Sequence, residues 1–385
     1  MEEKVLAAIG ICSFIGVLTY VLSGRKKLTS IGPDSLVYPG LVNVGNSCYL
    51  NSVLQALASV SIFVSWLKQH AQENNDGKNN LTKELFKYLQ ILNEPSCRMG
   101  VSFDPSTIFE CLYSHGWVIP SQQHDAHEIF LVLLSTVAEE LAVSQEIHHR
   151  KIISSPEKET KFDNNGIVLQ GGIAGSKLPT TLSYPFDGLF ANQMTCEICS
   201  YKHAVKFDAF QTISLSLPSM GFRTEVCTLE MLLEDFMNSE SLDSVKCPQC
   251  FCASLQSGKH QKTHFLKKLS IAKLPSCLSL LINRSYWRDD GAPYKNNMFV
   301  KFSETLKIDS FVKSKQPWNA SSARVVYRLM SVIVHTGDAN CGHYVTYRRT
   351  SGYKWSVSSD ERVRSVSLDH VLHTSAYMIF YEKKT

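Results

Sequence analysis

Residues 40–52 read GLVNVGNSCYLNS, and they place Cys48 where a loop with two glycines runs into a helix. We expect the helix over residues 47–60, because apolar residues recur there with the spacing of one buried face: Leu50, Val53, Leu54 and Leu57. Asn46 or Ser47 is suited to cap it. A thiol in the first helical turn lies near the positive end of the macrodipole, which lowers its pKa. The segment predicts a nucleophile, although a single cysteine of this kind is more often a buried small hydrophobe.

Two later segments contain the residue types that activate a thiol. Residues 340–349, NCGHYVTYRR, place His343 after a glycine at the start of an apolar strand, where it is a candidate base for Cys48. His335, in the segment VIVHTGD, is the nearest competitor, since a turn brings it close without making it the base. Residues 355–360, WSVSSD, are expected to supply the group that orients the histidine.

Two pairs of cysteines have the spacing of a metal site. The pairs are Cys196 with Cys199 and Cys247 with Cys250, each separated by two residues, and Cys252 is a possible substitute ligand. Two such pairs in a reduced compartment predict tetrathiolate zinc. Because four sulfur ligands leave the metal no open position for chemistry, we expect a structural zinc that contributes on the order of 10 kcal/mol to folding.

The order of helical and strand patterns indicates the fold class. Helical patterns come first, over residues 47–60, 81–92 and 125–141, and residues 142–180 are polar and are interpreted as a surface insertion. Short β-type runs follow at residues 205–217, 263–282, 324–335, 343–349, 354–358 and 375–382. Helices followed by strands that turns separate predict an α+β protein with largely antiparallel sheets.

The first residues predict a membrane anchor. Residues 5–22, VLAAIGICSFIGVLTYVL, contain no charge, and with the next two residues they approach the roughly 20 apolar residues that cross a bilayer. A cleaved signal peptide is the alternative, but it needs a basic leading region, whereas here the lead is MEEK and the basic triplet RKK follows at residues 25–27. The positive-inside rule then leaves the bulk of the chain in the cytosol.

Composition narrows the class of protein. A chain of 385 residues with 44% apolar content suits one large catalytic domain or two ordinary domains. Net charge is +4 and no Lys/Arg run follows residue 27, so we expect no nucleic-acid partner. The twelve cysteines agree with the cytosolic side, where thiols stay reduced for metal binding or catalysis.

Five blocks, which follow one another along the chain in the family's order, resemble the ubiquitin-specific protease family. GLVNVGNSCYLNSVLQAL resembles its cysteine box, QQHDAHEIFLVLL its second box, and GHYVTYRR with SAYMIFYEK its histidine box and closing strand. PFDGLFANQMTCEIC and CPQC resemble its zinc-bearing fingers, and CLSLLINRSY the strand after them. The resemblance covers roughly residues 40–385. It implies a papain-like cysteine protease with fingers, palm and thumb, and the anchor with the SD pair most resembles the member in the mitochondrial outer membrane.

The resemblance also implies roles for individual residues. Cys48 matches the nucleophile, His343 the base, Asn43 the oxyanion position and Asp125 a residue that contacts the basic ubiquitin tail. For Asp125, capping its own helix is an equally good explanation. At the third catalytic position most members have Asn or Asp followed by Asp, whereas this chain has Ser359 followed by Asp360. We favour Ser359, because in a strand Asp360 falls on the other face, and keep Asp360 as the alternative. A serine brings no negative charge, so we expect slow turnover.

These observations predict the organisation of the whole chain. We expect an N-terminal anchor with its basic flank at residues 1–27 (membrane helix about 5–24), a linker at 28–39 and a catalytic domain at 40–385. Within that domain we expect the thumb at about 40–141, the insertion at 142–180, zinc fingers within about 185–265, and the palm in the remainder.

The predicted function is removal of ubiquitin from ubiquitinated membrane proteins by thiol-dependent hydrolysis of the isopeptide bond. The expected location is the mitochondrial outer membrane, facing the cytosol, with the endoplasmic reticulum as the alternative. There the resemblance implies opposition to ubiquitin-driven mitochondrial clearance. The competing hypothesis is a weak or inactive ubiquitin-binding module at a membrane, which only the serine at the third position supports. A general papain-like protease has no use for zinc fingers.

Overall fold

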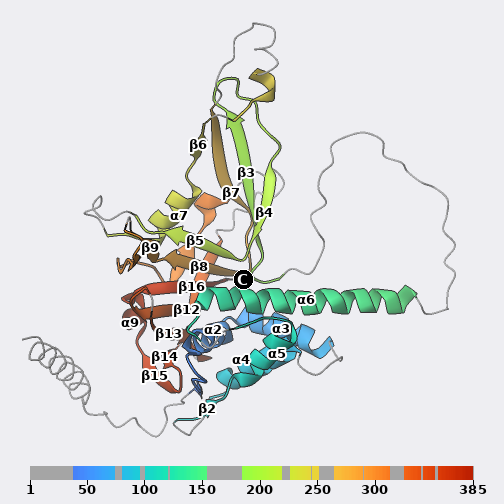
Figure 1. The fold of residues 1–385 in the computed structure, drawn as a ribbon, viewed down its shortest axis with the longest axis vertical. Coiled ribbons are helices and arrows are strands. Elements are labelled where there is room, and N and C mark those ends of the chain that lie inside the picture. The colour runs from blue at the N-terminus through green and yellow to red at the C-terminus, as the bar shows by residue number, and fades with distance from the viewer. Residues whose placement is uncertain are drawn as a thin grey trace, which may run out of the picture.

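The computed structural model describes residues 38–73, 80–95, 100–119, 122–153, 184–218, 226–243, 245–250, 264–288, 290–312, 325–339, 341–351 and 354–384. They form an α+β fold, as the order of patterns predicts. In Figure 1 a group of helices lies beside the lower strands of a large sheet, and a narrow group of strands rises above both. The predicted N-terminal transmembrane helix and linker lie outside the described residues, apart from the linker's last two positions. Within the described part of the chain, no single helix has the length and apolar character to cross a membrane, and only the bent pair Cys48–Ala58 and Ser61–Ala71 meets these criteria jointly.

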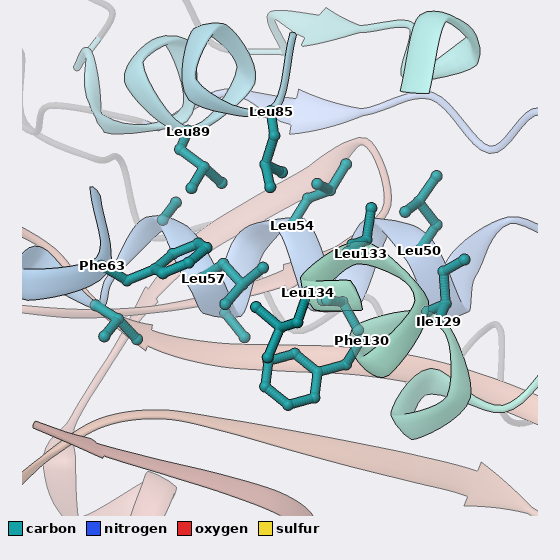
Figure 2. Packing of buried hydrophobic residues seen from close by; sticks show 14 of the residues in the cluster. Leu50, Leu54, Leu57, Phe63, Leu85, Leu89, Ile129, Phe130, Leu133 and Leu134 are labelled. Atoms are coloured by element: carbon teal, nitrogen blue, oxygen red, sulfur yellow. The ribbon is translucent and has the colours of Figure 1, made fainter. Parts of the chain in front are cut away.

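The helical layer packs around one buried helix. Its members are α2 (Cys48–Ala58), α3 (Ser61–Glu73), α4 (Leu81–Asn93), α5 (Ser106–Ser114) and α6 (Ala126–Ile153). Every residue of α2 is buried, because α4 and α6 cover it on the sides that the sheet leaves open. Figure 2 shows leucines of α2 packed against leucines of α4 and against Phe130 of α6. The regularly spaced apolar residues of α2 therefore pack against neighbours on three sides of the helix: α4, α6 and the sheet.

Helix α6 is longer than predicted. It was expected to end at residue 141, with an irregular insertion from residue 142, but it continues to Ile153. The added segment, AVSQEIHHRKII, contains neither glycine nor proline, and the first proline after it is Pro156. Nothing in the backbone chemistry therefore ends the helix earlier. The rest of the predicted insertion, from residue 154, lies outside the described residues up to residue 183.

The central sheet carries the site. It has eight strands in the order β15-β14-β13-β12-β16-β8-β5, with β11 paired to β12, and all its pairs are antiparallel except β5 with β8. The bounds are β5 (Thr212–Ser216), β8 (Cys277–Asn283), β11 (Thr305–Lys307), β12 (Val326–Gly337), β13 (Gly342–Arg349), β14 (Trp355–Ser359), β15 (Arg362–Val366) and β16 (Ala376–Lys383). Strand β13 crosses α2, so the helix that begins with Cys48 lies against the strand that begins beside His343.

A second sheet forms the arm seen at the top of Figure 1. Its order is β4-β3-β7-β6, with bounds β3 (Gly188–Cys196), β4 (Lys206–Phe210), β6 (Glu240–Leu242) and β7 (Phe265–Lys273). The remaining elements are short: β1 (Gly40–Leu41), β2 (Ser102–Phe103), α7 (Leu229–Met237), β9 (Ser285–Trp287), β10 (Pro293–Lys295), η1 (Asp309–Phe311) and α9 (Leu368–Leu372). Strands β9 and β10 form an antiparallel hairpin.

Candidate active site

The loop before α2 is built by backbone turns and by one asparagine. Gly45 and Asn46 adopt positive φ values of 81° and 58° and turn the chain into the helix. The Asn43 Oδ1 accepts the Ser47 N–H at 2.9 Å, and the Ser47 Oγ accepts the Val44 N–H at 2.9 Å. The prediction that Asn46 or Ser47 caps the helix is wrong for Ser47. Its hydroxyl makes no cap hydrogen bond and instead bonds to Val44 within the loop.

Cys48 is the first residue of α2 and is only 3% exposed. Burial is the main influence on its thiol and raises the pKa, and the negative charge of Asp360 acts in the same direction. Donors oppose this effect: the Tyr344 N–H, and the Gln123 Nε2 at 3.5 Å from the sulfur. The expected lowering of the pKa is therefore wrong in its net direction, because removing a thiolate from water outweighs these donors. A thiol of this kind needs a base to react.

His343 lies on β13 and meets the end of β14. Its Nε2 is 2.8 Å from the Ser359 Oγ, whereas the nearer oxygen of Asp360 is 3.9 Å from the same nitrogen. The Tyr344 N–H that donates to the Cys48 sulfur belongs to the next residue, so the ring and the thiol are neighbours. With Nε2 engaged by Ser359, Nδ1 is the nitrogen left to serve the thiol.

Asp360 ties the two ends of the domain together. It adopts a positive φ of 49°, a conformation open to Asp, and turns β14 into β15. One carboxylate oxygen accepts from the Asn43 Nδ2 and the other from the Asn51 Nδ2, each at 2.9 Å, and its carbonyl accepts the Leu41 N–H at 3.0 Å. The side chain is therefore committed to the cysteine loop and holds Asn43 in place.

Gln123 is a site residue that the sequence reasoning assigned no role. Its Nε2 donates to the Gly342 carbonyl at 2.8 Å, and its Oε1 accepts the Gly342 N–H at 3.1 Å. The same amide nitrogen reaches the Cys48 sulfur. One side chain therefore links the thiol to the residue before His343. In the sequence, Gln123 lies two residues before Asp125, in the segment QQHDAHEIF.

His335, the competing histidine, lies beside the site, on the strand that pairs with β13. Its Nδ1 is 3.0 Å from the Lys295 ammonium, and its ring lies against Tyr344 at 4.5 Å between centroids. Burial and the Lys295 charge lower the pKa of His335 to about 4. The ring is therefore neutral near pH 7, and its Nδ1 already accepts a hydrogen bond from Lys295.

Asp125 caps helix α6, which was the alternative explanation given for it. Its Oδ1 accepts the N–H groups of His127 at 2.7 Å and Glu128 at 3.3 Å, and its Oδ2 accepts the Tyr377 hydroxyl. Tyr377 in turn lies 5.7 Å from the Tyr344 ring. The carboxylate is thus close to the site, at the start of the helix and beside the aromatic residues that line β13.

The four predicted metal-ligating cysteines come together at the tip of the arm. The sulfurs of Cys196, Cys199, Cys247 and Cys250 all lie within 4.8 Å of one another. Opposite pairs are separated by 3.8 Å (Cys196 to Cys250) and 3.5 Å (Cys199 to Cys247). Tetrahedral zinc with bonds of about 2.3 Å separates its sulfurs by about 3.8 Å, so the donor set fits zinc. Cys252 lies outside the described residues.

Comparison with known proteins agrees with this geometry. A family model described as ubiquitin carboxyl-terminal hydrolase matches residues 39–381. The chain is 31% identical to ubiquitin carboxyl-terminal hydrolase 30 of Xenopus tropicalis over 97% of this chain and 86% of that protein. It is 28% identical to the Homo sapiens protein of the same name, over 97% and 89%. Among solved structures, the SAGA Ubp8/Sgf11/Sus1/Sgf73 DUB module bound to ubiquitin aldehyde is similar in fold, with a TM-score of 0.65 at 21% identity over 97% of this chain and 76% of that chain.

Proposed function

The chain belongs to the ubiquitin carboxyl-terminal hydrolase family, and from that membership we propose that it is a deubiquitinating cysteine peptidase with Cys48 as nucleophile and His343 as base. The observation that carries the proposal is the pair of contacts around His343: its Nε2 meets Ser359, while the next residue's N–H meets the Cys48 sulfur. This arrangement leaves Nδ1 to receive the thiol proton.

The reaction follows from these positions. The Cys48 proton passes to His343, and the thiolate attacks the carbonyl carbon at the ubiquitin C-terminus. The imidazolium then gives its proton to the departing lysine amine, which leaves a thioester that water hydrolyses with His343 again as base. Ser359 holds the ring's tautomer and orientation but supplies no charge. The Asn43 amide, fixed by Asp360, stabilises the oxyanion, an effect often worth ~3–4 kcal/mol.

The layers of the fold suggest how ubiquitin is held. In this proposal the helices up to α6 act as the thumb, the eight-stranded sheet as the palm and the β4-β3-β7-β6 arm as the fingers, which grip the ubiquitin body. The ubiquitin tail runs between thumb and palm to Cys48. Asp125, beside Tyr377 at the start of α6, faces the basic tail while it caps its helix.

A ubiquitin that carries a C-terminal electrophile tests the nucleophile directly. The full chain is expected to form a covalent adduct at Cys48, and Cys48→Ala is expected to form none. Cys341→Ser is the matched control, because Cys341 is an exposed cysteine two residues from His343. Labelling that persists in Cys48→Ala would show that another residue is the nucleophile.

The second candidate is a ubiquitin-binding module with little turnover. The observation that favours it is the neutral hydroxyl of Ser359 where a carboxylate would stabilise the imidazolium. A chain that binds ubiquitin but never cleaves a fluorogenic ubiquitin conjugate would support this candidate over the enzyme.

We further propose that the chain is anchored in the mitochondrial outer membrane and removes ubiquitin from membrane proteins there, in opposition to mitophagy. The uncharged residues 5–22 and their basic flank support the anchor, and the family resemblance supports the membrane. A fusion of residues 1–40 to a fluorescent protein is expected to stain mitochondria. Staining of the endoplasmic reticulum, the alternative location, would overturn the mitochondrial location.

A further inference from the structure

The hairpin β9–β10 places a lysine against the end of β12, the strand that pairs with the start of β13 beside His343. The Lys295 ammonium donates to the His335 Nδ1 at 3.0 Å, to the His335 carbonyl at 3.0 Å and to the Gly337 carbonyl at 2.9 Å. An ammonium has three donors and no acceptor, so these three acceptors satisfy it fully. The Nδ1 of His335 must therefore be the unprotonated ring nitrogen, which accepts the hydrogen bond. Strands β10 and β12 are thereby joined next to the site, across 40 residues of sequence.

His335 in turn contacts the backbone at the start of β13. A Cβ on Gly342 would lie 2.3 Å from the His335 Nε2 and 2.2 Å from the Thr336 carbonyl oxygen, so the imidazole lies directly against the residue before His343. The Thr336 hydroxyl donates to the His343 carbonyl at 3.0 Å across the same ladder. Gln123 holds Gly342 from the other side through both of its backbone groups.

The hairpin is itself fixed at its base. Arg284, which is 3% exposed, donates through Nη1 to the carbonyls of Asn296 at 3.0 Å and Met298 at 2.9 Å, and its own carbonyl accepts the Asn296 N–H at 2.7 Å. The Tyr286 hydroxyl accepts the Leu217 N–H at 2.9 Å. Lys295 therefore projects from a braced support, which a positioning role requires.

We propose that Lys295 is a positioning residue: through His335 it fixes the β12–β13 turn, so that His343 faces Cys48 before substrate arrives. The inference rests on the proposed role of His343 as the base. Lys295 acts through other residues and does not touch the reacting atoms. Without it, the turn gains freedom, and a misplaced base lowers the rate of the chemical step more than it weakens substrate binding.

Two variants of the 385-residue chain test this proposal. Lys295→Met removes the donors but keeps the stem, and we expect kcat on a fluorogenic ubiquitin conjugate to fall by about tenfold or more, with a smaller change in KM. Lys295→Arg keeps a charge and donors in a planar fork that does not match the three acceptors, so an intermediate kcat is expected. Lys307→Met, at an exposed position on β11, is the matched control and is expected to keep the original kcat.

A titration and a urea unfolding curve together separate positioning from a general loss of structure. The groups that act on His335 are Lys295 from β10, Asp125 from the start of α6, and Asp338 and His343 from its own hairpin. Lys295 lowers the pKa of His335, so Lys295→Met is expected to raise it, and NMR of the histidine ring protons will show His335 titrating at a higher pH than in the original chain. Because burial is the larger cause of the low pKa, local unfolding would raise it as well, so the shift counts only if the urea unfolding curve of Lys295→Met matches that of the original chain.

The outcomes distinguish this inference from the proposed function. An unchanged kcat in both Lys295 variants, or a rise in KM alone, overturns the positioning role while Cys48→Ala remains inactive. Turnover by Cys48→Ala would instead overturn the proposed function. If Lys295→Met does not fold, Lys295→Arg is judged by the change in kcat against KM alone, because it keeps the charge that lowers the His335 pKa.

Discussion

A single hydroxyl contacts the ring of His343, the proposed base. Because the Ser359 Oγ is 2.8 Å from the His343 Nε2, Ser359→Ala leaves that nitrogen without its partner in the protein, and we expect kcat to fall by roughly tenfold. A fluorogenic ubiquitin conjugate measures it. Ser365→Ala, at an exposed position on the neighbouring strand β15, is the control and is expected to be silent. If Asp360→Asn abolished turnover while Ser359→Ala were as active as the original chain, Asp360 would be the third catalytic residue.

Asp360 has opposite effects on the thiol and on turnover. Its charge raises the pKa of Cys48, so Asp360→Asn is expected to lower that pKa and to speed alkylation of Cys48 at neutral pH. Turnover should nonetheless fall, because Asn43 loses a charged acceptor that fixes it. The check is the pH dependence of alkylation by iodoacetamide, whose rate follows the thiolate fraction. In the original chain the rate should keep rising above neutral pH; a plateau already below pH 7 would contradict the raised pKa.

Helix α4 is capped by a carboxylate from another helix. The Glu140 side chain on α6 accepts the N–H groups of Leu81 at 2.7 Å and Thr82 at 2.9 Å, and the Thr82 hydroxyl at 2.6 Å, while His115 lies 3.1 Å away. Glu140→Gln weakens this buried set of hydrogen bonds, and we expect the free energy of unfolding to fall by about 1–3 kcal/mol. Urea unfolding measures the loss.

The adjacent residue gives a matched control for this prediction. Glu139 is exposed on the same helix, and Glu139→Gln makes the same chemical change without a buried partner. It should alter the free energy of unfolding by less than about 0.5 kcal/mol. Equal losses in the two variants would mean that the carboxylate does not stabilise α4 through its cap.

The sequence predicts elements where one local signal suffices. Helix α2 follows from periodicity, the start of α6 from the Asp125 cap, and the strands from β12 to β14 from short apolar runs between turns. Helices α3 and α5 were not predicted, although α3 begins where the Glu382 carboxylate accepts the Ile62 N–H at 2.8 Å. That cap comes from β16, 320 residues away, and leaves no local trace.

The site divides in the same way. Cys48, His343 and the zinc cysteines lie in recognisable local patterns. The structure places His343 next to the residue whose N–H contacts the Cys48 sulfur, and it gathers the four cysteines at the tip of the arm. The role of Gln123, the restraint of Asn43 by Asp360 and the net rise of the Cys48 pKa depend on burial and on contacts between distant segments. No spacing in the sequence indicates how deeply a residue is buried by elements that lie far from it along the chain.

For the whole molecule, the zinc cluster stabilises the arm and not the site. Cys196, Cys247 and Phe265 form a small buried core of their own, separate from the two large hydrophobic clusters. Cys247→Ser is therefore expected to lose the metal, unfold the arm's tip and raise KM for ubiquitin by roughly tenfold or more, because metal binding and folding are coupled. Alkylation of Cys48 should be unchanged.

Elemental analysis and kinetics check this together. The original chain should hold one zinc per molecule, and Cys341→Ser, which removes an exposed cysteine outside the cluster, should hold the same amount. A Cys247→Ser chain that kept full zinc, or that kept its original KM after losing zinc, would contradict the assignment.

The link between Asn43 and Asp360 also governs when activity can begin. These residues are 317 positions apart, and β16, which follows Asp360, runs through the middle of the sheet. During synthesis on the ribosome the nucleophile therefore emerges early, whereas the residues that complete its surroundings emerge among the last. A nascent chain cannot hydrolyse ubiquitin conjugates until translation is almost finished. Premature termination between residues 48 and 343 yields a protein that has Cys48 but lacks His343, the proposed base.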